Sequence, residues 1–219
     1  ITMYRDKLGY ELNTAAKISY AYKLKFADST NLTFGLSAGI TSRSIDLDQM
    51  VFESNEPLVS SGSLESKIKP DFGFGARFMW KKLDLQFSAT HISSKLDVYD
   101  YNNIPRHLYG MASYTFRMSK KFSLTPSVFL KSNSKLNQVD VNVRSLIDER
   151  FMFGLGYRIN EAAIIALGMK ITDNISFVYS YDYVTGSSKA LSRSNHEIVL
   201  IGRLNGFNKS VKGKSKASF

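Results

Sequence analysis

Alternation of apolar and polar residues with a period of two recurs along most of the chain, and it constrains the fold more than any other feature. In residues 174–184, for example, Tyr179, Tyr181 and Tyr183 alternate with Ser180 and Asp182. Helical periodicity is nearly absent, so the pattern predicts an all-β protein. We expect about eleven antiparallel strands, near residues 14–26, 31–42, 70–80, 82–92, 106–118, 121–131, 137–146, 150–159, 162–171, 174–185 and 195–204.

The two faces of these strands differ sharply in composition. One face collects aromatic and aliphatic side chains without any acid or base, as at Ile18, Tyr20 and Tyr22. The opposite face carries charges among Gly, Ser and Thr. Such alternation fits a soluble sandwich with its apolar face inward, and equally a membrane barrel with that face outward. In a barrel the charges predicted to face the lumen, either pairing there or attracting anions, are Arg77, Arg117, Arg144, Arg158, Asp182 and Arg203.

The connections between strands favour the membrane barrel. Tight turns such as "ADST", "SKK" and "TDN" largely alternate with the long polar segments 43–66, 93–105 and 186–194. Outer-membrane barrels have short periplasmic turns and longer external loops. We therefore predict an antiparallel transmembrane β-barrel of the outer membrane, with tyrosines such as Tyr179 and Tyr181 facing lipid near the headgroups.

Strand parity predicts that the barrel extends beyond this sequence. Eleven antiparallel strands would leave both ends on the periplasmic side, so an odd number of strands, plausibly three, should precede residue 1. The full-length barrel would then have about fourteen strands. We assign residues 1–204 to the barrel and residues 205–219 to a basic tail in the periplasm. Pro126 lies within an expected strand, where it predicts a bulge or a break.

Composition narrows the classes of protein to which the chain can belong. The net charge is +10, which is compatible with nucleic acid, anionic lipid or an acidic partner. Without cysteine the chain has neither disulfides nor thiolate metal sites. Its longest apolar run, "AAIIALGM" at 162–169, is far too short for a membrane helix, which needs about 20 residues.

Candidate catalytic and cofactor motifs are weak. His91, His107 and His196 lack the spacing of zinc ligands, so we expect neither a metal nor a cofactor. The "SNHE" stretch at 194–197 places Ser194 near His196, but consecutive strand residues point to opposite faces, and we interpret it as a strand start. "GFGAR" at 73–77 and "GLGYR" at 154–158 are not followed by helices, so they predict no phosphate site. We expect no enzymatic activity.

Two segments are candidates for binding protein partners. The "DQMVFESNEP" loop is acidic yet contains Met50, Val51 and Phe52, a mixture suited to gripping a protein; it is alternatively an ordered lid. The C-terminal stretch "NGFNKSVKGKSKASF" either solubilises the chain or contacts an acidic partner or the cell wall. Its basic residues are Lys209, Lys212, Lys214 and Lys216.

Residues 153–204 resemble the C-terminal part of the PorP/SprF family of type IX secretion outer-membrane proteins of Bacteroidetes. The matching elements are "GYR" at 156–158, Ala162, Gly168, "YSYD" at 179–182 and "HEI" at 196–198. "DKLGYELNTAAKISYAYKLKF" and "LTFGLSAGI" are similar to earlier regions of that family. The resemblance implies a non-enzymatic component for export or surface attachment of cargo, including gliding adhesins. It also implies a periplasmic ring as partner, beside the outer-membrane lipid.

Three other functions remain open at this point. A general diffusion pore or solute channel would use the charged lumen. A lipid-modifying enzyme would need polar groups on the lipid face, where the apolar residues leave almost none. A soluble basic β protein would bind nucleic acid with strong salt dependence; we do not expect a nucleic-acid partner.

Overall fold

The computed structural model of the chain describes residues 1–9, 11–45, 67–93, 104–133, 136–186 and 193–203. In these segments thirteen strands form one antiparallel sheet, which confirms the all-β prediction. A search of the same segments finds no helix with the length and hydropathy to span a membrane. The fold is the one expected of an outer-membrane β-barrel.

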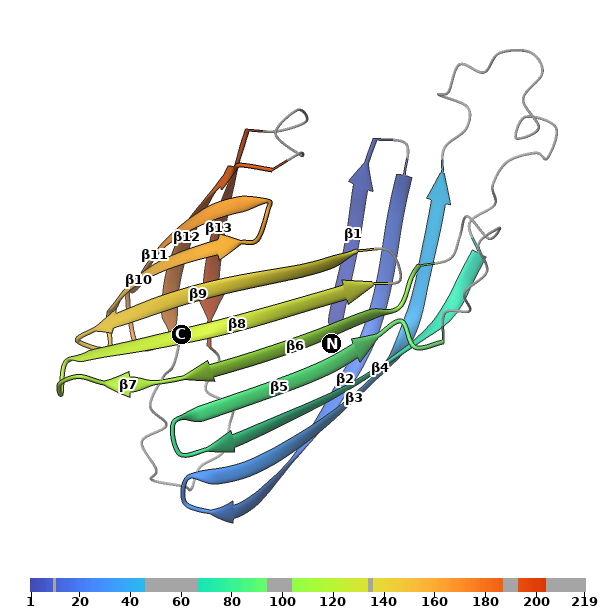
Figure 1. The fold of residues 1–219 in the computed structure, drawn as a ribbon. Coiled ribbons are helices and arrows are strands. Elements are labelled where there is room, and N and C mark those ends of the chain that lie inside the picture. The colour runs from blue at the N-terminus through green and yellow to red at the C-terminus, as the bar shows by residue number, and fades with distance from the viewer. Residues whose placement is uncertain (10, 46–66, 94–103, 134–135, 187–192, 204–219) are drawn as a thin grey trace. The chain divides into compact units, whose positions relative to one another are not determined.

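The strands follow one another across the sheet in chain order, with β7 pairing only with β8 (Figure 1). Their bounds are β1 (Thr2–Leu8), β2 (Glu11–Ala27), β3 (Thr30–Ile45), β4 (Lys67–Trp80), β5 (Leu83–Thr90), β6 (His107–Tyr114), β7 (Phe116–Arg117), β8 (Phe122–Asn133), β9 (Asn137–Ile147), β10 (Phe151–Arg158), β11 (Ala162–Lys170), β12 (Ile175–Val184) and β13 (Ser194–Gly202).

The sheet divides into two compact units. The first comprises Ile1–Trp80, Leu85–Gly110 and Lys131–Asn137, and the second comprises Lys81–Asp84, Met111–Leu130 and Gln138–Phe219. Pairing of β2 with β3 and of β3 with β4 lies within the first unit. Pairing among β9, β10, β11, β12 and β13 lies within the second.

The pairing register brings like residues together on each face of both units. In the first unit Tyr20 lies opposite Leu36, and Leu36 lies opposite Phe74. In the second, Leu155 pairs with Val143 on one side and Ile165 on the other. The positions between these apolar residues carry the charged side chains. We call these two surfaces the apolar face and the polar face.

The described segments contain two more strands than the eleven expected. Strand β1 was not predicted because its sequence, TMYRDKL, has charged residues on both faces of the strand and therefore no apolar face. The expected strand at 106–118 is divided into β6 and β7. Because β1 adds a crossing before β2, the parity argument for an odd number of preceding strands loses its basis.

The irregularity predicted at Pro126 lies on the neighbouring strand. Strand β8 is continuous through Pro126, whereas the chain beside it is interrupted at Thr115, between β6 and β7. Thr115 Oγ1 lies 3.1 Å from Thr125 Oγ1, and the Thr115 amide donates to the Lys82 carbonyl. Since proline has no amide hydrogen to donate, a local loss of regular pairing is expected beside it.

Candidate functional site

Burial is inverted relative to a water-soluble protein. On the apolar face large side chains are widely exposed, with Tyr20 at 71% and Leu200 at 70%. The buried residues other than glycine in the described segments are Ala, Val, Thr and Asp, and the largest side chain that is almost completely enclosed is that of Asp71, at 2%. Register places almost all of these on the polar face: Ala15, Thr41, Asp71, Asp140, Ala162 and Val184. A soluble sandwich would show the reverse, so the apolar face is a surface for lipid.

A first charge cluster occupies the polar face of the first unit. Lys17 on β2, Gly39 on β3 and Asp71 on β4 form one row across the sheet. Lys17 Nζ lies 2.5 Å from Asp71 Oδ2, so the lysine side chain passes over Gly39 to reach it. A Cβ at Gly39 would lie 2.9 Å from Lys17 Cγ and 2.7 Å from Lys17 Cα. Glycine is thus required for this contact.

His91 completes the first cluster just beyond β5. Its Nδ1 lies 3.0 Å from the same Asp71 oxygen, and its ring centroid lies 5.9 Å from that of His107. Within the described segments neither Asp71 oxygen nor His91 Nδ1 makes a hydrogen bond with suitable angles, so Lys17 and Asp71 form an ion pair, whereas His91 is charged in this contact only when it is protonated. Burial lowers the pKa of His91 below 6.5; Asp71 opposes this change, and Lys17 and His107 add to it.

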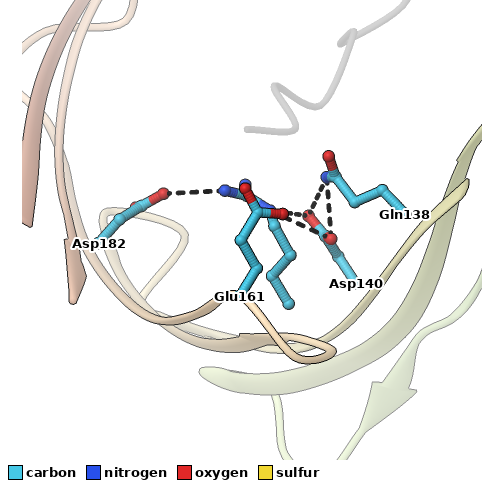
Figure 2. Close-up of polar contacts among 5 residues, drawn as sticks. Gln138, Asp140, Glu161 and Asp182 are labelled. Atoms are coloured by element: carbon cyan, nitrogen blue, oxygen red, sulfur yellow. Dashed lines mark hydrogen bonds and ion pairs between the residues drawn. The ribbon is translucent and has the colours of Figure 1, made fainter. Parts of the chain in front are cut away.

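A second cluster lies on the polar face of the second unit, centred on Arg158. Its Nε lies 3.3 Å from Asp140 Oδ1, and its Nη1 lies 3.5 Å from Asp182 Oδ2. Figure 2 shows Asp140 with Gln138 on one side and Asp182 on the other. Gln138 Nε2 donates to Asp140 Oδ1 at 3.0 Å, and Glu161 lies 4.0 Å from Arg158 Nε. Arg158 therefore links β9, β10 and β12.

The spacer in this second cluster is a small side chain. Ala162 on β11 pairs with Arg158 on one side and Val184 on the other, and it is 1% exposed. Its methyl group leaves room for the guanidinium to reach β12, two strands away from β10. The structure therefore brings together two of the predicted lumenal charges, Arg158 and Asp182.

Register and exposure give the positions of the other predicted lumenal charges. Register places Arg77 opposite Thr33, on the face that also carries Asp71, and Arg144 opposite Gly154, on the face that carries Arg158. Arg117 and Arg203 are exposed at strand ends. The predicted partner-binding residues lie outside the described segments: Met50, Val51, Phe52, Lys209, Lys212, Lys214 and Lys216.

The "SNHE" stretch forms the start of β13, as expected, although the reasoning about its faces was wrong. Residues two apart on a strand share a face, so Ser194 and His196 point the same way, opposite Tyr183 and Tyr181. His196 Nδ1 lies 2.8 Å from the Tyr179 hydroxyl, and its ring packs 5.0 Å from that of Tyr181.

The described residues include no group of three His, Cys, Asp or Glu side chains that could hold a metal.

Comparison with known proteins places this arrangement in a family. Residues 1–201 match the family described as "Type IX secretion system membrane protein PorP/SprF". The chain belongs to the PorP/SprF family. A search of curated proteins finds no match to it. The resemblance noted from residues 153–204 is confirmed, and membership identifies a membrane component of the type IX secretion system, which fits an exposed apolar face.

Sequence reasoning missed the first cluster of this PorP/SprF protein. Alternation places both Lys17 and Asp71 on the charged face of their strands, yet nothing in the sequence indicates that residues 54 positions apart are in contact. The available signal was Gly39 on the same face of the strand between them. A glycine between two charged strand positions is a usable indicator of a side chain crossing over a strand.

Proposed function

We propose that this PorP/SprF protein is a non-enzymatic outer-membrane component that supports export or surface attachment of cargo, such as a gliding adhesin. Family membership connects the protein with the type IX secretion system. The exposed apolar face is the single structural observation that supports a place in the membrane. In this proposal the polar face encloses the lumen. The ion-paired clusters at Asp71 and Arg158 hold that interior together.

Two segments are proposed to contact partners. The loop containing Met50, Val51 and Phe52 binds the secreted surface protein. The tail containing Lys209 and Lys212, together with the short turns, docks to the periplasmic ring of the same apparatus. The proposed orientation places the tail in the periplasm and the loop outside, following the usual arrangement of outer-membrane barrels.

The test is affinity purification of the tagged, full-length protein from its native membrane in mild detergent. We expect secretion components and a surface protein to copurify. Replacing Met50, Val51 and Phe52 by Ser should lose the surface protein and keep the ring. Replacing Lys209, Lys212, Lys214 and Lys216 by Gln should do the opposite. Recovery of neither partner class with the unaltered protein would refute the proposal.

A diffusion pore is the second candidate, and the charged polar face is the observation that favours it. Planar-bilayer recordings of the purified protein separate the two. A pore gives steady single-channel conductance whose ion preference changes when Arg77 or Arg144 is neutralised. A protein that serves only as a secretion component gives no such conductance on its own.

A further inference from the structure

In the second unit, the turns that connect the strands at one end of the sheet follow one another along a continuous edge. The Lys82 carbonyl accepts from the Thr115 amide at 3.0 Å, and the Lys121 carbonyl accepts from the Asp148 amide at 2.7 Å. Equivalent bonds of 2.8 Å join Lys170 to Arg150 and Arg203 to Asn174. We call this edge the basic rim, and it comprises residues 81–84, 117–121, 148–150, 170–174 and 203.

The basic rim carries twice as many cations as anions, with eight Lys or Arg and four Asp or Glu. Two of the four acidic residues form ion pairs with lysines of the rim. Asp148 lies 3.4 Å from Lys121, and Asp173 lies 3.0 Å from Lys170. Lys82, Lys120 and Arg150 are exposed. The rim therefore presents a positive potential to whatever surrounds it.

Exposed rings of the apolar face stand directly beside these cations. Phe116 precedes Arg117, and Phe151 follows Arg150; both rings are about half exposed. The Arg150 guanidinium carbon lies 5.6 Å from the Phe151 ring centroid. Trp80, also half exposed, precedes Lys81. Aromatic rings gather at the membrane interface, and neighbouring Lys and Arg extend their charged ends toward the headgroups.

We infer that the basic rim binds the phosphates of anionic phospholipid headgroups and concentrates these lipids around one end of the sheet. The cations lie where the lipid-facing surface ends, which is the level of the headgroup phosphates. Successive turns are two strands apart, about 10 Å, so several headgroups fit along the rim at once. The side chains of these cations adjoin exposed lipid-facing rings, as Arg150 adjoins Phe151, which favours a lipid headgroup over an acidic protein as their ligand.

Trp80 provides the test, because it is the sole tryptophan and adjoins Lys81. The purified full-length protein, with any tryptophan outside residues 1–219 replaced by Phe, is reconstituted in mixed phosphatidylcholine and phosphatidylglycerol vesicles. Bromine is placed on the chains of one lipid or the other. Quenching of Trp80 then gives the relative affinity for the two lipids. We expect phosphatidylglycerol to bind about threefold more tightly in low salt.

The decisive variant replaces Lys81, Lys82, Lys120 and Lys121 by Gln and should bring the ratio close to one. Its matched control removes Lys23 and Lys25, two cations of the polar face of β2, and should keep the preference. Heat-modifiable gel mobility verifies that each variant is folded. Equal quenching by both lipids in the unaltered protein, or an unchanged ratio in the rim variant, would overturn the inference. Because only folded protein in lipid is measured, the result is independent of any role in secretion.

Discussion

Lys17 Nζ lies 2.5 Å from Asp71 Oδ2, although strand β3 separates the strands that carry them. The contact spans two strand spacings, about 9.6 Å of sheet, and it is made at the most deeply buried large side chain of the described segments. A long side chain can bridge this distance only where the intervening residue has almost no volume. Gly39 satisfies that condition, and the whole cluster depends on it.

Substitution of Gly39 by Ala should destabilise the protein. The added methyl group would overlap the backbone of Ala16 and Lys17 and displace the lysine side chain. Overpacking of this kind costs about 1–3 kcal/mol. The free energy of unfolding can be measured by urea titration in vesicles. Gly35→Ala is the matched control on the same strand, since its new Cβ would meet only ordinary contacts of 3.8 Å or more. Equal effects of the two substitutions would contradict the spacer role of Gly39.

Removal of the Asp71 carboxylate alone should cost more than removal of the whole pair. Asp71→Ala leaves the Lys17 ammonium, 17% exposed, without its nearest counter-charge, and such losses cost about 3–5 kcal/mol. In the double variant Lys17→Met/Asp71→Ala no charge is left unpaired, so the loss should be smaller. A double-mutant cycle on the same urea titrations measures the coupling. Strict additivity of the two single changes would argue against a direct interaction.

Mild acid should weaken the first cluster through His91. Its pKa in the folded protein is lowered below 6.5 by burial, so the unfolded chain takes up the proton first as the pH falls. The stabilising contribution is therefore complete above pH 6.5 and is lost as the pH falls toward the folded-state pKa. Unfolding free energies measured from pH 7.5 to 5 should decline for the native sequence. His91→Gln should flatten that slope; an unchanged slope would exclude His91 as its source.

Arg158 should be far less replaceable than its exposed neighbour Glu161. Arg158→Lys retains the charge but loses the planar group that contacts Asp140 and Asp182 together. We expect a loss of about 2–4 kcal/mol, because at least one half-buried carboxylate is left without its cation. Glu161→Gln should change stability by less than about 1 kcal/mol, as its side chain is 44% exposed. Similar losses of unfolding free energy in the two variants would show that the contacts of Arg158 are not the main source of stabilisation.

The sequence predicted the strands and their faces because alternation is a local property. Ile18 and Tyr20 follow the period of two whatever their strand pairs with, and register then aligned them with the apolar residues of β3. Strand β1 was missed because Met3, Arg5 and Lys7 share one side and Tyr4 and Asp6 the other, which leaves no apolar set to detect.

The contacts within the clusters depend on register, which alternation does not determine. Arg158 and Asp182 were both predicted on one face, but their meeting depends on how β10, β11 and β12 are aligned and on the small volume of Ala162. The Thr115 interruption likewise reflects Pro126 only through the neighbouring strand. Such features follow from pairing between strands and not from any one segment.

The inverted burial has a consequence for how the molecule is made. Before insertion, the rings of Tyr20, Phe151 and their neighbours have no acyl chains to cover them, and a collapse that hid them would trap Asp71 and Lys17 on the wrong side. The newly made chain is consequently expected to reach its native arrangement only when acyl chains are present to cover these rings.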